Sequence, residues 1–310
     1  RAHAGNRAPG LHMKSASCCQ APTRAFPACQ WEYIRLPTGC NCRQRPACVR
    51  CLGRIPGCLS RFPGTAPDWL RQLQPLGPKK IDLIDNIFRN RLRCIMSIDE
   101  MLGNIRKLLS QTGVSGHTYI FFSSDNGYHL GDYSMVQGKQ TPFDIDIRVP
   151  LIACGPNVAK ESWQQAIVSN IDLAPTFAAL AGAQLTDEPD GRDIQQFLRK
   201  QNTEKINWRN FAIIEHRRVD FNLNDPDRQE AENGKLPSYT ALRFHNLLYV
   251  EYETGEISCY DVQNDPYELK NIASALPIEK QKTLHSILLS AKSCGDKNGC
   301  WGVQMMKLKK

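Results

Sequence analysis

A carboxylate and a carboxamide stand side by side directly after an apolar run of the chain. Asp125 and Asn126 follow Tyr-Ile-Phe-Phe at 119–122, a segment that favours a β-strand, and Lys139 comes fourteen residues after the aspartate. Side-chain oxygens of these two types are hard donors, which suit Ca²⁺ or Mg²⁺ better than Zn²⁺. Gly127 would let the backbone turn so that both side chains face one point, where Lys139 offers a positive charge to a bound anion. Asp-Asn-Gly also fits an ordinary turn, so these residues alone leave both interpretations open.

The segments on either side of this pair indicate a layered α/β domain. A long helix is predicted by apolar residues at steps of three and four from Ile81 to Leu109, with Gly113 where the helix would end. Strands are expected at 118–123 and 149–154, and a short helix at 173–180 with Asp172 as its cap. Ligands in such domains gather at the carboxyl ends of strands, which is where the Asp-Asn pair lies.

After residue 200 the pattern changes to short strands, which are predicted at 211–215, 238–243, 247–252 and 256–260. A hairpin turn at Thr254-Gly255 would join the last two strands. A helix is expected from 277 to 292, with Leu284, Ile287 and Leu288 on one side. Residues 201–310 are therefore predicted to form a small antiparallel sheet with a helix, after a main domain at 61–200.

The composition is that of a globular protein, since 41% of the 310 residues are hydrophobic and 23% are charged. No apolar stretch approaches the roughly 20 residues that span a bilayer, and no segment at the start has the hydrophobic core of a secretory signal. The net charge of +8 belongs to residues 1–60, because residues 61–310 hold 30 basic and 30 acidic side chains. The main body therefore gives no electrostatic reason to expect a nucleic acid partner.

Residues 1–60 also contain eight of the thirteen cysteines. Four of them, Cys40, Cys42, Cys48 and Cys51, could supply the thiolates of a metal knuckle, although their inner spacing is unusual. An arginine-rich targeting peptide is an alternative, but such peptides are not rich in cysteine. We favour a third interpretation, in which this segment has no independent fold. Because the first residue is an arginine, we also expect the chain to be a fragment.

Residues 123–156 resemble the metal- and sulfate-binding segment of the sulfatase family, which belongs to the alkaline-phosphatase-like superfamily. Their sequence is SSDNGYHLGDYSMVQGKQTPFDIDIRVPLIACGP. The similarity continues through NIDLAPTFAALAG, FAIIEH and DVQNDPYELKNIA, and runs from about Arg61 to the end. It is closest to the N-acetylglucosamine-6-sulfatase and arylsulfatase branch, whose tail also carries a short pair of cysteines like Cys294 and Cys300. A disulfide between these two would be worth roughly 2 kcal/mol by loop closure and favours an oxidising compartment.

This resemblance implies a fold, a cofactor and a substrate class. The fold is an α/β, alkaline-phosphatase-like mixed sheet with flanking helices, here incomplete, plus the small carboxyl-terminal antiparallel sheet and helix. By matching position, Asp125 and Asn126 would bind calcium. Lys139 would contact the sulfate of a sulfated sugar or aryl ester, as a substrate-binding and catalytic residue. Family members are secreted, periplasmic or lysosomal, and the sequence assigns this chain to none of these compartments.

The family's chemistry, as the resemblance implies it, starts from a cysteine in a C-x-P-x-R type motif. That cysteine becomes a formylglycine, whose hydrated aldehyde attacks sulfur. This sequence lacks the motif: Cys19-Gln20-Ala21-Pro22-Thr23-Arg24 comes near, but its proline and arginine are each one residue too far. The Asp-Asp pair that provides further metal ligands in the family is also absent. We therefore predict the carboxyl-terminal part of a sulfatase joined to an unrelated front, with weak calcium binding, negligible hydrolysis and an uncovered apolar face on the long helix.

Two other functions stay open. One is a non-catalytic sulfatase-like protein that binds a sulfated ligand. The other is a phosphomonoesterase or phosphonate hydrolase of the same superfamily, against which the segment around Lys139 argues. Among other side chains, we expect His129 to order its loop, and Glu215 and His216 are candidates for substrate contact. Cys94 on the helix and Cys154 on a strand are expected to be ordinary buried thiols.

Overall fold

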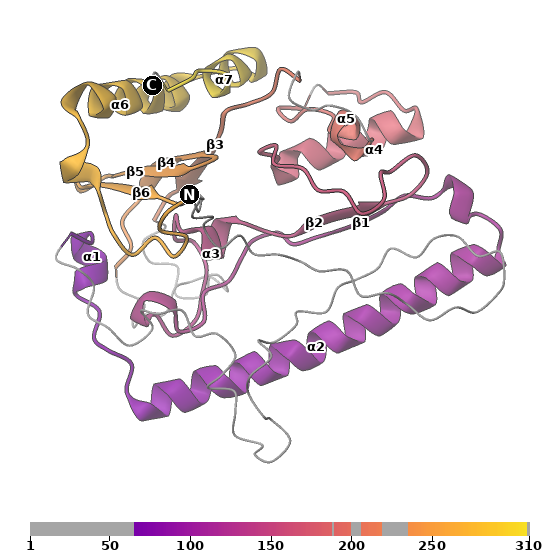
Figure 1. The fold of residues 1–310 in the computed structure, drawn as a ribbon, viewed down its shortest axis with the longest axis horizontal. Coiled ribbons are helices and arrows are strands. Elements are labelled where there is room, and N and C mark those ends of the chain that lie inside the picture. The colour runs from indigo at the N-terminus through magenta and orange to yellow at the C-terminus, as the bar shows by residue number, and fades with distance from the viewer. Residues whose placement is uncertain (1–64, 188, 200–205, 219–234, 309–310) are drawn as a thin grey trace, which may run out of the picture. The chain divides into compact units, whose positions relative to one another are not determined.

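The computed structural model describes residues 65–187, 189–199, 206–218 and 235–308 (Figure 1). The predictions for residues 1–60, including the metal knuckle, lie outside the described residues. The helices are α1 (Asp68–Arg71), α2 (Pro78–Gln111), α3 (Asp144–Ile147), α4 (Leu173–Ala181), α5 (Gln195–Leu198), α6 (Ile278–Ser293) and α7 (Lys297–Gln304), with short 3-10 turns η3 (Ser115–His117), η4 (Asp132–Ser134), η5 (Asn170–Asp172) and η8 (Ala273–Ala275). The strands are β1 (Ile120–Ser123), β2 (Leu151–Cys154), β3 (Phe211–His216), β4 (Tyr239–Phe244), β5 (Leu247–Tyr252) and β6 (Ile257–Asp261).

Helix α2 confirms the predicted long helix. It starts at Pro78, which suits a first helical position, and Gly113 follows its end with a φ of 75°, a backbone conformation that favours glycine. Within the helix only Ile84 is buried, and it packs with Leu76 and Val136. The amino-terminal turns of α2 are thus anchored by a small apolar cluster.

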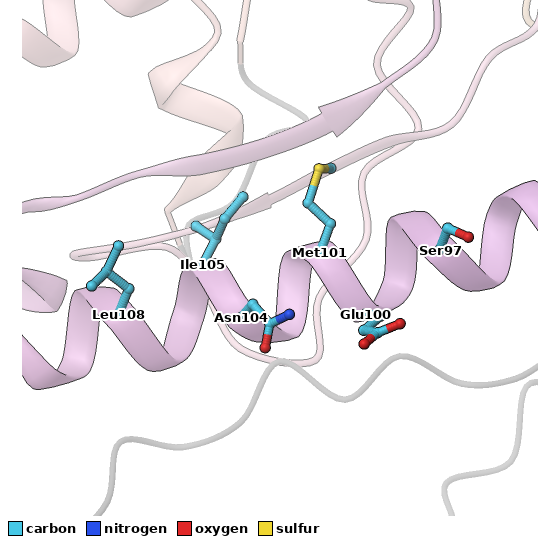
Figure 2. Close-up of a pocket in the computed structure, with 6 residues that line it drawn as sticks. All are labelled: Ser97, Glu100, Met101, Asn104, Ile105 and Leu108. Carbon is cyan, nitrogen blue, oxygen red and sulfur yellow. The ribbon is translucent and has the colours of Figure 1, made fainter.

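The predicted apolar face of α2 is uncovered only in part: Leu92, Ile95 and Ile105 are exposed, whereas its residues Phe88, Ile98, Leu102 and Leu109 are partly buried. Further apolar side chains are exposed beside this face. The exposed apolar residues of α2 are Leu83, Leu92, Ile95, Met96, Met101, Ile105 and Leu108. Met101, Ile105 and Leu108 lie on one side of the helix and line an open hollow (Figure 2). The prediction that Cys94 is buried is wrong, because the thiol lies on this uncovered part of the helix. Cys154 on β2 is partly buried.

Strands β1 and β2 form a two-stranded antiparallel sheet in which Ile120 pairs with Cys154 and Ser123 with Leu151. Both predicted strands are confirmed, each somewhat shorter than expected. The segment between them leaves the sheet at Ser123 and returns at Leu151. Asp125, Asn126 and Lys139 therefore all lie in one connection between two paired strands.

The predicted carboxyl-terminal strands are also confirmed, and they form one antiparallel sheet in the order β3-β4-β5-β6 (Figure 1). On one face Leu242 and Tyr249 pack against Leu284 and Leu288 of α6. On the other face the sheet residues Ala241, Leu248, Val250 and Tyr260 pack in one cluster with Trp69, Tyr133, Met135 and Phe143. Because Tyr133, Met135 and Phe143 come from the β1–β2 connection, this sheet supports the segment that carries the site.

Asp172 occupies the N-cap position of α4, as predicted, but its side chain makes no capping hydrogen bond to that helix. Ser169 caps the turn η5 that leads into α4, and the Asp172 side chain accepts from the Ser169 backbone N–H at 2.8 Å. The Asp172 carboxylate thus serves as the third residue of the capping box of η5. The helix ends at Gly182, which has a φ of 66°.

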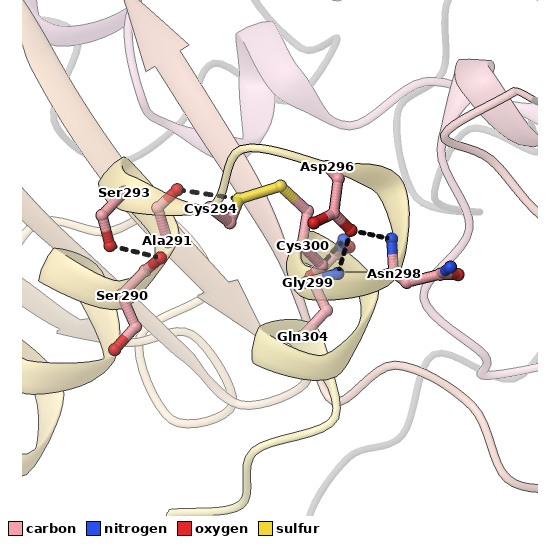
Figure 3. Close-up of a disulfide and its surroundings, with 9 residues drawn as sticks. All are labelled: Ser290, Ala291, Ser293, Cys294, Asp296, Asn298, Gly299, Cys300 and Gln304. Carbon is pink, nitrogen blue, oxygen red and sulfur yellow. Dashed lines mark hydrogen bonds between the residues drawn. A yellow bond between two sulfur atoms is a disulfide. The ribbon is translucent and has the colours of Figure 1, made fainter.

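Cys294 and Cys300 form a disulfide, which agrees with the expectation from the resemblance (Figure 3). The bond links the end of α6 to α7, and Asp296 caps α7 by accepting from the backbone N–H groups of Asn298 and Gly299. The tail helices are therefore held by a covalent link and a helix cap together.

Asp144 links the β1–β2 connection to Arg243 on β4 and to the buried Glu268, which lies after β6. Arg243 on β4 donates to both oxygens of Asp144, at 2.7 and 2.8 Å, and Glu268 accepts from the Asp144 backbone N–H at 2.8 Å. Burial, with the nearby charge of Asp144, raises the pKa of the Glu268 carboxyl to about 8. At neutral pH the folded protein therefore keeps this carboxyl largely protonated.

The raised pKa predicts a stability that falls as the pH rises. An unfolded glutamate titrates at about 4.3, so between pH 4.3 and 8 the folded chain holds a proton that the unfolded chain has released. We expect the stability advantage of Glu268→Gln over the wild type to be about 3 kcal/mol larger at pH 8 than at pH 5. Urea unfolding at both pH values measures this. Equal stability differences at pH 5 and pH 8 would contradict the assignment.

Candidate functional site

Asp125 lies just beyond the end of β1 with its carboxylate exposed to solvent. Its Oδ1 accepts from the backbone N–H of Asn126 at 2.9 Å and from the Ser124 hydroxyl at 3.3 Å. The pKa of the Asp125 carboxyl is lowered, mainly because of the hydrogen bond from the backbone N–H of Asn126. The loop thus presents an ionised carboxylate at the surface.

Asn126 and Lys139 lie together. The Asn126 Nδ2 donates to the carbonyl oxygen of Gly127 at 2.7 Å, which fixes the orientation of the amide. Its Oδ1 is thereby turned toward Lys139, whose Nζ lies 3.4 Å away. The structure therefore brings the three predicted residues into one place, with a carboxylate, an amide oxygen and an ammonium group next to one another.

Gly127 lies at a close approach between two segments, which the sequence did not predict. Gly127 does not have a positive φ, so its backbone conformation does not itself require glycine. It is needed because the backbone passes very close to α3: a Cβ at this position would lie 2.0 Å from the carbonyl oxygen of Ile145. The Gly127 N–H donates to the carbonyl of Asp146 at 2.7 Å across this contact.

His129 orders the loop, as predicted. Its ring is fully buried, and Nδ1 lies 2.8 Å from Oδ2 of Asp146. Its backbone forms an antiparallel bridge with Gly138, the residue before Lys139. The side chain therefore acts on the shape of the connection rather than reaching the surface beside Asp125.

Asn170 holds the backbone at Ser124 and Asp125 in place, a role that the sequence did not predict. Its Nδ2 donates to the carbonyl oxygens of Ser124 and Asp125, both at 3.1 Å. Asn170 opens the turn η5 before α4, so this turn is a second element, besides α3, that contacts the segment of the Asp-Asn pair. The only sequence signal was its place at the start of the segment NIDLAPTFAALAG.

Glu215 and His216 lie at the end of β3. The Glu215 side chain is exposed, while burial lowers the pKa of His216, whose ring lies 5.5 Å from that of Tyr239. Their contact with substrate stays a prediction.

Asp125 and Asn126 offer the type of oxygen donor that a hard cation prefers, but they are too few to fill its coordination shell. Asp125 and Asn126 offer carboxylate and amide oxygens, whereas calcium takes six to eight oxygen ligands in proteins. The described residues contain no cluster of three or more histidine, cysteine, aspartate or glutamate side chains that could hold a metal. A cation at this point would therefore need further ligands besides these two.

Comparison with known protein families gives two overlapping matches. Residues 18–183 match the model of the Sulfatase family, and residues 135–293 match that of the N-sulphoglucosamine sulphohydrolase carboxyl-terminal region. The first range includes Asp125, Asn126 and Lys139, and also the segment 19–24 that comes near the nucleophile motif.

Individual relatives agree with these matches. The chain is 30% identical to human N-acetylglucosamine-6-sulfatase over 253 residues, which covers 74% of this chain and 46% of that protein. It is 29% identical to the sulfatase ppz1 of Metarhizium majus, covering 74% of this chain and 49% of the relative. The chain thus spans about half the length of the curated relatives it matches.

Two solved structures are similar at 25% identity. One is BT4656 in complex with its substrate D-glucosamine-2-N,6-O-disulfate, with a TM-score of 0.55 over 64% of this chain and 38% of that one. The other is the phosphonate monoester hydrolase of Agrobacterium radiobacter, with a TM-score of 0.51 over 64% of this chain and 40% of that one. These likenesses support the predicted alkaline-phosphatase-like fold, of which the chain covers a part.

Proposed function

The chain belongs to the sulfatase family, and we propose that its β1–β2 connection provides part of a site that binds and hydrolyses sulfate esters. The observation that carries the proposal is the grouping of Asp125, Asn126 and Lys139 at the end of β1. Each of the three matches a residue of the family's metal- and sulfate-binding segment in type and in order. The geometry puts their charged and polar atoms in one place.

The roles of these residues follow from their chemistry. Asp125 and Asn126 would hold calcium, which when bound supplies positive charge that neutralises and orients the sulfate group. Lys139 would place an ammonium beside the same anion, where it stabilises negative charge in the bound ester. A sulfated sugar is the substrate class we propose, because BT4656 was solved with a disulfated glucosamine.

Nucleophilic attack is the step for which this sequence offers no group. No cysteine in the 310 residues has the spacing of the C-x-P-x-R type motif. We therefore propose that this chain alone binds calcium and a sulfate anion weakly and turns over sulfate esters at a negligible rate.

One experiment tests binding and turnover together. The purified chain is titrated with calcium and inorganic sulfate by calorimetry, and its hydrolysis of 4-methylumbelliferyl sulfate is followed in the presence of calcium. We expect Asp125→Ala to weaken calcium binding by at least about tenfold, since it removes the charged ligand. Lys139→Ala should weaken sulfate binding by a similar factor. Asp99→Ala, an exposed aspartate on α2, is the control and should change neither.

The outcomes separate the parts of the proposal. A folded chain that binds no calcium would exclude Asp125 and Asn126 as metal ligands. Turnover that Asp125→Ala abolishes would show that a nucleophile is present after all. Phosphonate hydrolysis is a second candidate, since a phosphonate monoester hydrolase is similar in structure. Tighter binding of phenylphosphonate than of sulfate would favour it.

A further inference from the structure

Asp146 lies in the β1–β2 connection, on α3, and its side chain is 1% exposed. Its Oδ2 accepts from the backbone N–H of Thr141 at 3.0 Å and from the Thr141 hydroxyl at 2.6 Å. The same oxygen lies 2.8 Å from Nδ1 of His129. A carboxylate only accepts hydrogen bonds when ionised, so Nδ1 carries the proton in this contact.

The backbone of the same residue holds the other half of the candidate site. The carbonyl oxygen of Asp146 accepts from the N–H of Gly127 at 2.7 Å, directly after Asn126. One residue therefore bonds to the segment just after Asp125 and Asn126 through its backbone, and to the segment just after Lys139 through its side chain.

Lys139 is held from both directions. Before it, Gly138 exchanges two backbone hydrogen bonds with His129, at 2.9 and 3.1 Å. After it comes Gln140, which has a φ of 85°, and then Thr141, which Asp146 anchors. A residue other than glycine at positive φ is a strained conformation that the surroundings must stabilise. The two anchors flank this strained position and fix the direction in which the Lys139 backbone runs.

We propose that Asp146, with His129 and Thr141, is a positioning centre that holds the Asp125-Asn126 pair and Lys139 in one fixed arrangement. The inference rests on the proposed function for the meaning of that arrangement. It adds three residues that would not contact the calcium or the sulfate themselves. They would act by fixing the positions of Asp125, Asn126 and Lys139. Breaking one buried contact should therefore loosen both halves of the site together.

The ring of His129 allows a matched pair of variants. Its Nε2 is buried and has no hydrogen-bond partner among the residues that the structure describes. Among the described residues, the ring makes its side-chain hydrogen bond through Nδ1. The amide nitrogen of an asparagine can occupy the position of Nδ1. A glutamine is longer, so its amide nitrogen lies near the position of Nε2. His129→Asn should therefore preserve the centre, and His129→Gln should break it.

Native-state hydrogen exchange of the purified chain tests the centre without any ligand. We expect His129→Gln to speed exchange at the amides of Gly127 and Thr141 by at least tenfold, and His129→Asn to change both by less than threefold. Leu288→Ala, which alters the buried face of α6, is the control for general destabilisation and should affect Gly127 and Thr141 no more than other protected amides. If His129→Gln releases neither amide, or only one of the two, a common positioning centre is excluded.

Ligand titration then connects the centre to the site. His129→Gln should weaken calcium and inorganic sulfate binding together, each by about tenfold, while Leu288→Ala binds both like the wild type below its melting temperature. Unchanged affinities in His129→Gln would overturn the positioning role. A wild type that binds neither ion would overturn the proposed function instead, and the exchange experiment would still decide whether the centre exists.

Discussion

Replacing Asp172 by alanine is expected to lower the free energy of unfolding by about 3 to 5 kcal/mol. The Asp172 side chain is fully buried, and its Oδ1 accepts from Nη2 of Arg209 at 2.5 Å and from the backbone N–H of Arg192 at 2.8 Å. The other oxygen accepts from Ser169 in the capping box. The substitution removes all three interactions and leaves a buried guanidinium without its counter-charge.

The position of Arg209 explains why the effect is large. Its side chain is 1% exposed, and its guanidinium carbon lies 5.3 and 5.0 Å from the ring centroids of Trp208 and Trp301. Burial lowers the pKa of this guanidinium, but the group remains charged, so the cost of its desolvation stays in the folded protein. Its Nε and Nη1 already have no hydrogen-bond partner among the described residues, which leaves no other acceptor to replace Asp172.

Chemical denaturation monitored by tryptophan fluorescence measures this prediction. Asp187→Ala, at an exposed aspartate, is the matched control and should stay within about 0.5 kcal/mol of the wild type. The double variant Asp172→Ala with Arg209→Met should recover part of the loss, because it removes the unpaired charge as well. A loss in Asp172→Ala no larger than in the control would show that the ion pair does not stabilise the fold.

Gly127→Ala is expected to destabilise the chain by about 3 kcal/mol and to abolish measurable calcium binding. The added Cβ would meet the carbonyl oxygen and carbon of Ile145 at 2.0 and 2.8 Å, and backbone atoms cannot rotate away as a side chain can. The loop must therefore move off α3, which breaks the bond from Gly127 to Asp146 and displaces Asn126.

Gly103→Ala is the control for this substitution. Gly103 lies in α2, where an added Cβ has nothing within 4 Å, and alanine favours a helix over glycine by about 0.5 to 1 kcal/mol. The control should therefore be neutral or slightly stabilising and should bind calcium like the wild type. Thermal unfolding and calcium titration of both variants give the answer, and a stable Gly127→Ala chain with unchanged affinity would refute the close approach.

The local elements and the family could be predicted from the amino-acid pattern. Steps of three and four predicted α2 and α6, and alternation with turn residues predicted β3 to β6 within one or two residues, because these periods follow from the backbone geometry of each element. The order of Asp125, Asn126 and Lys139 in the chain identified the candidate site. The types of these residues and their order can be compared with a family even when the contacts between them are unknown.

The packing partner of each element could not be predicted in this way, because it depends on the fold. The period of α2 showed which residues form its apolar face but not whether a partner covers that face, so Cys94 was misjudged as buried. Likewise, the sequence predicted Asp172 at the start of α4 but not its buried ion pair with Arg209, 37 residues later. Gly127 and Asp146 belong to the same class, because a close approach between segments about 20 residues apart leaves no periodic trace. Local patterns record the conformation of one segment, whereas burial and ion pairing depend on segments that only the fold brings together.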